Sequence, residues 1–318
     1  MSLSRFHKQY YNNNFCINFS TNNKDIYSLV ENYLDLKDDR PRSKLVNIDI
    51  NIESVNKTKA VPTTTRKSNL EYVSAEGLKC AKYSNVTIDH KIKKITSLLS
   101  DFKQKDKEHI LYHTFFKPLK LLLLKMDYHS IHSSIVTKDN CCIFICGPQN
   151  TGKSTTAFLF TKLGYGIVCD DDCFIKAKKD NVILSPLPTK MGVKDSILKR
   201  YPLISSMLVK DYKYGGKRRA SLSNFYKTVK SDFKTKVILM PRYSETEKFS
   251  IKKAPRKWVL CKLFNENFND EGQQNKETFS KAFLSYFALV KDAKCFEIIY
   301  NDKTITKIPS AVERQINQ

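Results

Sequence analysis

The sequence predicts an α/β fold with a mixed β-sheet flanked by helices, preceded by a less defined N-terminal segment. Three observations predict it. Two short apolar runs separated by a polar spacer indicate paired strands, a glycine-containing loop then leads into an apolar helical segment, and another apolar run follows that helix. The order strand, loop, helix, strand is that of a βαβ-type unit. We place the N-terminal segment at residues 1–105 and the α/β domain at residues 106–318.

The sequence of the central region, residues 115–169, predicts five helices and strands in order. They are a helix at 115–126, strands at 131–136 and 141–146, a helix at 153–163 and a strand at 167–169. The spacer between the two strands contains Asp139-Asn140, which is typical of a hairpin turn. Gly164 follows the second helix and is the residue type expected to end it.

The flanking regions carry weaker patterns. Downstream, we predict strands at 182–184, 237–240 and 295–300, helices at 193–200 and 278–290, and a surface loop over the polar stretch 265–277. Upstream, residues 84–92 read as a strand and 95–102 as a short amphipathic helix. The polar stretch 57–69, which contains Pro62 and several threonines, is typical of a linker.

Composition limits the class of protein. Hydrophobic residues make up 41% of the 318 and charged residues 27%, which is the range of globular chains. The longest dense apolar run, 119–126, is interrupted by two lysines and is far shorter than the roughly 20 residues needed to cross a bilayer. With no secretory signal pattern at the start, we expect a cytoplasmic protein. The nine scattered cysteines form no CxxC pair, which argues against a zinc site.

The net charge of +23 predicts an anionic partner. Nucleotide phosphates, an acidic peptide, nucleic acid and a membrane surface all satisfy that requirement, and charge alone does not choose among them. A lysine-rich composition can also follow from a biased genome.

One motif carries specific chemistry. Residues 147–154, Gly-Pro-Gln-Asn-Thr-Gly-Lys-Ser, match GxxxxGK[ST] at every required position and lie between a strand and a helix. The backbone N–H groups of such a loop and the helix dipole hold phosphate oxygens, the lysine reaches the β- and γ-phosphates, and the serine binds magnesium. The alternative is a turn that merely joins strand to helix. The predicted nucleotide-binding residues are Gly147, Asn150, Thr151, Gly152, Lys153, Ser154 and Thr155.

Three acidic residues follow the strand at 167–169 directly. Ligands of open α/β sheets bind beyond the carboxyl ends of the strands, so Asp170 and Asp171 are expected near the phosphates. Carboxylates there can hold magnesium or accept a proton from an attacking hydroxyl. Asp172, taken alone, reads as a solvated loop residue.

The stretch IHSSIVTKDNCCIFICGPQNTGKSTTAFLFTKLGYGIVCDDD resembles the catalytic domain of HPr kinase and, more loosely, HPr-kinase-like enzymes that phosphorylate peptides. The resemblance is specific over residues 115–176 and implies a P-loop kinase core of the HPr kinase type. It implies that His132 assists the catalytic carboxylate, that Asp170 is the general base and that Asp171 is linked to magnesium. Without the resemblance, a histidine on an apolar strand is more often a core residue.

Other basic residues are weaker candidates. Arg242 follows a predicted strand and could supply a cation to the transferring phosphoryl group. Lys190 and Lys194 could line the acceptor groove. The loop 215–219, Gly-Gly-Lys-Arg-Arg, could close over an acidic acceptor or over the nucleotide, or it could simply be an exposed turn. Thr155 stands where HPr kinases commonly carry an acidic residue, and no Pro-Gly-Arg-type signature is found, so neither phosphorolysis nor HPr itself as substrate is expected.

These observations lead to one preferred hypothesis and its alternatives. We expect a kinase that uses ATP and Mg²⁺ to phosphorylate a hydroxyl, such as a serine of an acidic peptide or protein, with a homo-oligomer compatible with the sequence. The alternatives are a nucleic-acid-stimulated P-loop ATPase, which the charge of +23 motivates, and a non-catalytic nucleotide-binding protein.

Overall fold

The computed structural model describes residues 5–12, 14–34, 45–54, 70–74, 84–99, 110–179, 181–187, 189–200, 208–214, 217–221, 225, 233, 235–268 and 276–317. The chain divides into two compact units, Met1–Met126 and Asp127–Gln318. This division lies later than the boundary at 105/106 suggested by the sequence. The reason is local packing, because the Phe115 ring lies 5.9 Å from that of Phe19 and the Ser97 hydroxyl donates a 2.9 Å hydrogen bond to the Thr114 carbonyl.

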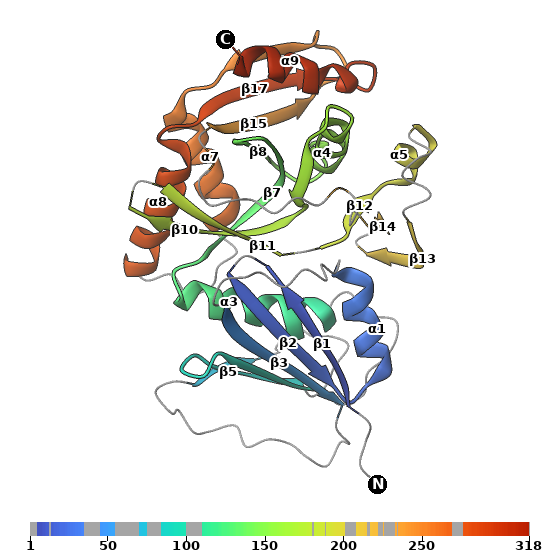
Figure 1. The fold of residues 1–318 in the computed structure, drawn as a ribbon, viewed down its shortest axis with the longest axis vertical. Coiled ribbons are helices and arrows are strands. Elements are labelled where there is room, and N and C mark those ends of the chain that lie inside the picture. Colours follow the sequence, from blue (N-terminus) through green and yellow to red (C-terminus); the bar gives the residue numbers. More distant parts are fainter. Residues whose placement is uncertain are drawn as a thin grey trace. The chain divides into compact units, whose positions relative to one another are not determined.

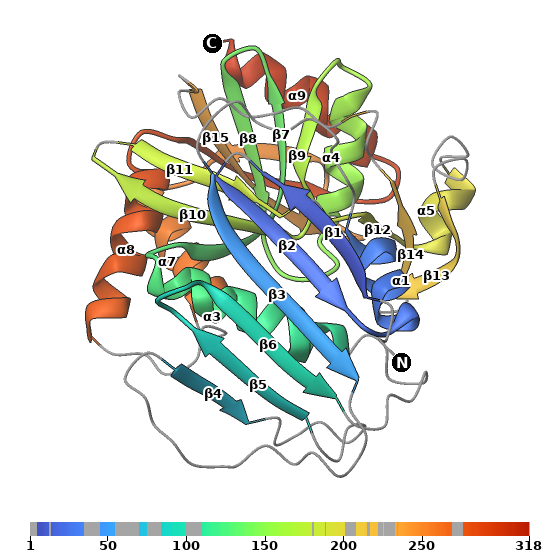
Figure 2. The same cartoon turned by 60° about the horizontal axis from the view of Figure 1, so that its bottom comes forward.

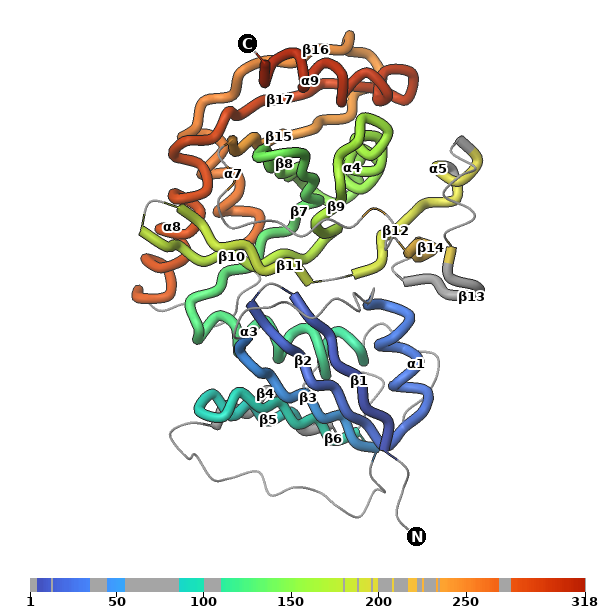
Figure 3. Tube along the Cα trace, in the orientation of Figure 1, coloured from blue at the N-terminus to red at the C-terminus, as the bar shows by residue number. Residues whose placement is uncertain are grey.

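The first unit is built on a six-stranded mixed sheet with strand order β1-β2-β3-β6-β5-β4 (Figures 1 and 3). The pairs β2–β3 and β3–β6 are parallel, and the others are antiparallel. Its elements are β1 (Phe6–Tyr11), β2 (Phe15–Thr21), α1 (Lys24–Tyr33), β3 (Val46–Ser54), β4 (Leu70–Ser74), β5 (Ser84–Asp89), β6 (Lys94–Leu99), the π-helical turn η2 (Tyr112–Phe116) and α3 (Lys117–Lys125).

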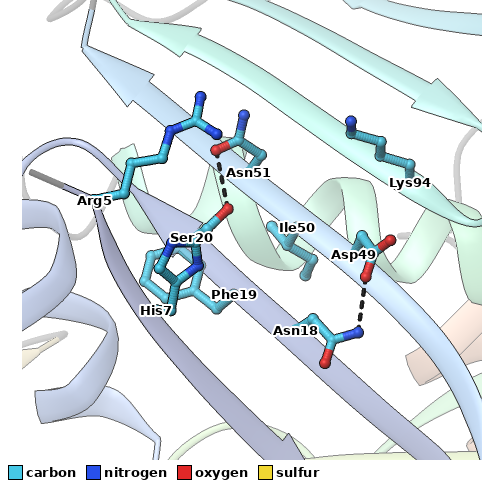
Figure 4. Close-up of a pocket in the computed structure, with 9 residues that line it drawn as sticks. All are labelled: Arg5, His7, Asn18, Phe19, Ser20, Asp49, Ile50, Asn51 and Lys94. Atoms are coloured by element: carbon cyan, nitrogen blue, oxygen red, sulfur yellow. Dashed lines mark hydrogen bonds between the residues drawn. The ribbon is translucent and has the colours of Figure 1, made fainter. Parts of the chain in front are cut away.

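The two faces of this sheet differ in polarity. On β3, Ile48, Ile50 and Ile52 are fully buried, whereas the alternating Asp49 and Asn51 are not. Figure 2 shows the strands in front of α3, which covers the apolar face. Hydrogen bonds on the polar face join neighbouring strands, as between Asn18 and Asp49 (2.8 Å), beside an open hollow of about 260 Å³ (Figure 4).

The N-terminal segment is thus more regular than its sequence suggests. The prediction of a helix at 95–102 is wrong over the described residues 95–99, because residues 94–99 form strand β6. Ile95, Ser97 and Leu99 are buried on alternate positions, which is the period of a strand, and β6 pairs on both sides. The strand expected at 84–92 is confirmed over 84–89. The predicted linker at 57–69 lies outside the described residues.

The second unit contains an eight-stranded mixed sheet. Its strand order is β11-β10-β7-β8-β15-β17-β16, and β9 also pairs with β7. The strands β8, β15 and β17 are mutually parallel, and β7 is antiparallel to β8 and to β9. Strands β8 and β9 therefore point the same way with β7 between them, so their carboxyl ends lie at one edge of the sheet.

The elements of this sheet are β7 (His129–Lys138), β8 (Cys141–Cys146), β9 (Gly166–Cys169), β10 (Asp172–Lys178), β11 (Asn181–Pro186), β15 (Thr235–Tyr243), β16 (Ser250–Lys253) and β17 (Lys294–Tyr300). Helices α4 (Lys153–Thr161), α7 (Arg256–Phe268), α8 (Lys276–Val290) and α9 (Ile308–Ile316), with the 3₁₀ turn η4 (Ile305–Lys307), flank it. A separate three-stranded sheet, β12-β14-β13, comprises β12 (Met191–Val193), β13 (Leu208–Tyr214) and β14 (Lys217–Ala220), with α5 (Asp195–Arg200) following β12.

The sheet is buried on both faces. Along β8, Phe144 and Cys146 enter a core shared with α7 and α8, whereas Ile143 and Ile145 enter a core shared with α4 and α9. A strand covered on both faces reads as a continuous apolar run, as β8 does. The predicted α/β class, with a mixed sheet flanked by helices, is confirmed.

Most predicted elements of this unit are confirmed, with two corrections. The surface loop expected at 265–277 is wrong at both ends, because residues 265–268 are the last turn of α7 and α8 begins at Lys276. Asn267 and Phe268 are buried, which a loop pattern does not anticipate. Asp172 begins β10 rather than lying in a loop. Among the described residues, no helix is long and apolar enough to span a bilayer.

Candidate functional site

The loop between β8 and α4 carries the predicted phosphate-binding sequence. Gly147, Asn150 and Gly152 have φ angles of 138°, 70° and 76°, conformations that glycine and asparagine adopt at least cost. Helix α4 begins at Lys153, and the Thr156 N–H donates to the Gly152 carbonyl at 2.8 Å. The first N–H groups of α4 have no partner inside the helix and lie at the positive end of its dipole.

Gly152 is required by a close approach from β17. A Cβ atom at this position would clash with the hydroxyl oxygen of Tyr300. That hydroxyl donates a 2.8 Å hydrogen bond to the Thr151 carbonyl, and the Thr151 hydroxyl donates to the Pro148 carbonyl at 2.9 Å. The carboxyl end of β17 therefore supports the loop from outside.

Lys153 is held inside the loop. Its ammonium donates hydrogen bonds to the carbonyls of Gly147 (2.8 Å) and Pro148 (2.9 Å), and the residue is only 5% exposed. Burial lowers the pKa of this amine, and the charges of Asp171 and Asp170 oppose that effect. The two predicted aspartates thus lie within electrostatic reach of the predicted phosphate-binding lysine. Ser154 and Thr155 are half-buried in the first turn of α4.

Asp170 follows β9 and is buried. The Ser134 hydroxyl donates a 2.5 Å hydrogen bond to its Oδ1, and the Gly192 N–H approaches its Oδ2 at 3.4 Å. Burial raises the pKa of Asp170 to about 6, and the nearby charge of Asp171 adds to this. Hydrogen bonds from Ser134 and Ser154 and the charge of Arg219 act in the opposite direction.

Asp171 faces a buried cation. Its backbone is left-handed, with φ 72°, and its Oδ2 lies 3.8 Å from an Nη atom of Arg219. Arg219 is 3% exposed and also donates a 2.8 Å hydrogen bond to the Lys190 carbonyl. It comes from β14, so the described part of the predicted basic loop 215–219 is a strand, and Gly215 and Gly216 lie outside the described residues.

His132 lies at the edge of this group. It is exposed on β7, its Cα opposes that of Asp172 in the β7–β10 pairing, and its backbone N–H donates a 2.6 Å hydrogen bond to Asn267. Because strand side chains alternate, His132 shares a face of β7 with Ser134, two residues away. The strand therefore presents the imidazole and the serine that binds Asp170 on the same side.

Arg242 is engaged elsewhere. It follows Pro241 near the end of β15, at the same sheet edge as the loop, and it is exposed. Its guanidinium forms two hydrogen bonds with Glu247 (2.5 and 3.0 Å) and lies 3.5 Å from Glu297. On β15 it lies two and four residues after Met240 and Ile238, which face the α7–α8 core, so its side chain belongs to the same face, opposite α4. Lys194 is exposed, and Lys190 contributes its carbonyl to Arg219.

Three contributors were not anticipated from the sequence, and a fourth, Arg219, was anticipated only as part of the basic loop 215–219. Ser134 bonds directly to Asp170, Tyr300 bonds to the loop, and Arg219 pairs with Asp171. Burial raises the pKa of Glu266 of α7, and the charge of the nearby Lys153 opposes this, so Glu266 lies close to Lys153. Arg219 had a signal in the cluster of three cations at 217–219. Ser134 and Tyr300 could have been found from their positions on predicted strands beside the loop.

The side chains present fit a magnesium-bound nucleoside triphosphate. A buried ammonium and the free N–H groups of α4 suit phosphate oxygens, and a serine hydroxyl with two carboxylates offers the hard oxygen ligands that magnesium prefers. Lys153 and the amides of the loop would hold the phosphates, and Ser154 with Asp171 would hold the metal.

Comparison with known proteins adds little. No protein-family model and no curated protein matches the sequence. Among solved structures, the Hpr(Ser) kinase/phosphatase from Coxiella burnetii matches with 13% sequence identity, covering 59% of this chain and 93% of that chain, at a TM-score of 0.26. A match at this TM-score carries no argument about the fold or the function of this chain.

Proposed function

We propose that this chain is a kinase that uses ATP and magnesium to phosphorylate a hydroxyl group, with a serine of a peptide or protein as the acceptor class. The proposal is supported chiefly by one observation. Asp170, buried and with its pKa raised to about 6, accepts a hydrogen bond from the Ser154 hydroxyl and lies near Lys153. A loop with a phosphate-binding sequence and a carboxyl group suited to proton transfer therefore lie close together.

Each side chain then has a distinct role. Lys153 and the N–H groups of α4 bind the phosphates, and Ser154 and Asp171 bind magnesium. Asp170 accepts the proton of the acceptor hydroxyl as that oxygen bonds to the γ-phosphorus and the bond to the leaving ADP breaks. A base whose pKa lies somewhat below neutral is largely ionised at neutral pH yet basic enough to accept a proton. Arg219 holds Asp171 in place through its buried guanidinium.

The acceptor should be acidic or neutral rather than basic. The chain has a net charge of +23, and Lys217 lies near enough to Lys153 to affect its pKa. A positive field around the site raises the local concentration of anions. Peptides with acidic residues next to serine are therefore the first to try.

The test uses purified full-length protein, radiolabelled ATP, magnesium and a set of acidic serine peptides, each with a serine-to-alanine partner. We expect label on the serine peptides only. Asp170→Asn should lower the transfer rate by roughly 100-fold or more while ATP binding, measured by calorimetry, persists. Asp172→Asn is the matched control on the same tripeptide and should have a much smaller effect. Rapid ATP hydrolysis with no labelled hydroxyl on any peptide would exclude the proposal.

A nucleic-acid-stimulated ATPase is the second candidate, and the net charge of +23 favours it. Such a protein would bind DNA or RNA with a steep salt dependence, because each phosphate contact releases counterions. Stimulation of ATP hydrolysis by nucleic acid in the assay above would support this candidate over the kinase.

A further inference from the structure

Helix α8 exposes an apolar face. Phe279, Phe283, Leu284 and Phe287 are 48%, 41%, 55% and 46% exposed, and we call them the α8 patch. The three phenylalanines are spaced by four residues, which places them along one side of a helix. Half of the eight large hydrophobic side chains exposed among the described residues belong to this one helix.

The opposite face of α8 already fills the core. Tyr286 and Leu289 are fully buried against the sheet, and the Tyr286 hydroxyl donates a 2.6 Å hydrogen bond to the Ser130 carbonyl. The orientation of α8 is therefore set by packing, and rotating the patch inward would expose this core. An exposed apolar cluster on a helix whose opposite face is already packed is often an interaction surface.

The patch is continuous with α7. The Phe264 ring lies 4.9 Å from that of Phe279 and 6.3 Å from that of Phe283, and Phe283 stacks on Phe287 with an interplanar angle of 13°. Figures 1 and 2 both show α7 and α8 side by side at the edge of the second unit. The rings form one surface on a rigid helical pair, in which Phe264 supports the more exposed rings of α8.

The surroundings of the patch are cationic. Helices α7 and α8 together carry the cations Arg256, Lys257, Lys262, Lys276 and Lys281 against the acids Glu266 and Glu277. Of the two acids, Glu266 is half-buried and lies near Lys153, and Glu277 pairs at 2.8 Å with Lys281, which also pairs with Asp127 at 2.9 Å. Lys276 lies three residues before Phe279, on the same side of α8. The exposed rings are thus bordered by long, flexible side chains that end in positive charge.

We propose that the α8 patch binds the surface of an anionic membrane, with its rings in the interfacial region and the neighbouring lysines on lipid phosphates. Aromatic and leucine side chains next to lysines are the composition that sits at this depth, and lysine stems lie along apolar surface while their ammonium groups reach the headgroups. The chain's charge of +23 adds long-range attraction to an anionic leaflet.

Area and charge argue against a second copy as the occupant. Four side chains of roughly 200 Å² each, about half exposed, offer roughly 400 Å², whereas a stable protein interface needs about 800 Å² from each partner. Pairing two copies through α8 would also bring their lysines together. An anionic bilayer needs no matching apolar partner of fixed shape, and it neutralises the lysines.

The test is co-sedimentation of the full-length chain with vesicles of phosphatidylcholine alone or with 30% phosphatidylserine. We expect at least tenfold tighter binding to the anionic vesicles. The double variant Leu284→Ser, Phe287→Ser removes the two patch residues with the least supporting contact and should weaken that binding by tenfold or more. The matched control is Ile92→Ser, which removes a side chain that is 60% exposed in the β5–β6 turn and should leave binding unchanged.

A second measurement reports insertion directly. The chain has a single tryptophan, Trp258, so Phe287→Trp in a Trp258→Phe background places one fluorophore in the patch. Its emission should shift to the blue on anionic vesicles and be quenched by brominated lipid. Unshifted emission, or equal vesicle binding by the Leu284→Ser, Phe287→Ser variant, would leave only nonspecific charge attraction and overturn the proposal. Self-association that the double variant abolishes, without vesicle binding by the wild type, would assign the patch to a second copy instead.

Discussion

The Ser134 hydroxyl donates a 2.5 Å hydrogen bond to Oδ1 of Asp170, joining β7 to the acidic turn after β9. The neighbouring Ser133 lies on the other side of the strand, where its buried hydroxyl has no hydrogen-bond partner among the described residues. Two adjacent serines of similar burial therefore have different roles.

Ser134→Ala should raise the pKa of Asp170 above its value of about 6, because the lost hydrogen bond stabilises the ionised form. It should also lower the free energy of unfolding at pH 8 by about 2 kcal/mol. Carbon-13 NMR titration of the carboxyl groups measures the first effect and urea unfolding the second. Ser133→Ala is the control, and we expect its stability to be unchanged or higher, since it removes an unsatisfied buried hydroxyl. Equal losses in both variants would contradict this.

Asp170→Asn should stabilise the protein at pH 8 in the absence of magnesium. The folded-state pKa of about 6 exceeds the ordinary value of 3.8, so the folded protein binds this proton more tightly than the unfolded chain. The stability from this group is fully present below pH 3.8 and is lost as pH rises through about 6. A difference of that size between the two pKa values corresponds to roughly 3 kcal/mol at most.

Urea unfolding of both proteins in EDTA at several pH values checks this prediction. The gain in the variant should be largest at pH 8 and shrink toward pH 4. A variant that is less stable than the wild type at pH 8 would show that the hydrogen bonds to Asp170 outweigh its burial.

Arg219→Gln should lower the free energy of unfolding by about 3 kcal/mol. It removes the positive charge that pairs with the Asp171 carboxylate and stabilises the ionised form of the buried Asp170. Arg218→Gln is the matched control on the same strand. Arg218 is exposed and pairs with Asp195 at 2.9 Å, a surface ion pair worth about 0 to 1 kcal/mol. Thermal denaturation of the two variants compares them, and similar midpoints would refute a structural role for Arg219.

Gly152→Ala should destabilise the loop through two separate effects. The backbone φ of 76° costs an alanine about 1 to 2 kcal/mol, and its Cβ would meet the Tyr300 hydroxyl. Tyr300→Phe removes that oxygen, so it should partly rescue Gly152→Ala although it costs about 1 kcal/mol alone through the lost bond to Thr151. A double-mutant cycle in urea measures the coupling, and strictly additive losses would show that the ring moves away freely.

Local sequence patterns were sufficient to predict the secondary structure at the centre of the second unit. The β7–β8 hairpin, the loop, α4 and β9 were predicted because apolar runs, turn residues and glycines follow one another within about 40 residues of sequence. The pattern failed at β6, where Ile95, Leu98 and Leu99 suit a helix as well as a strand. It also failed at the end of α7, where the polar sequence 265–267 suggested a surface loop although Asn267 is buried.

By itself, the sequence determined the loop, its lysine and serine, and the acidic turn, because each is a contiguous motif whose geometry follows from neighbouring residues. Only the tertiary structure decided which groups complete the site. Ser134 meets Asp170 because β9 and β10 pair with β7, Tyr300 reaches Thr151 across the sheet edge, and Arg219 rather than Arg242 faces the aspartates. Strand order and register fix these contacts, and they depend on packing between distant segments that no local periodicity encodes.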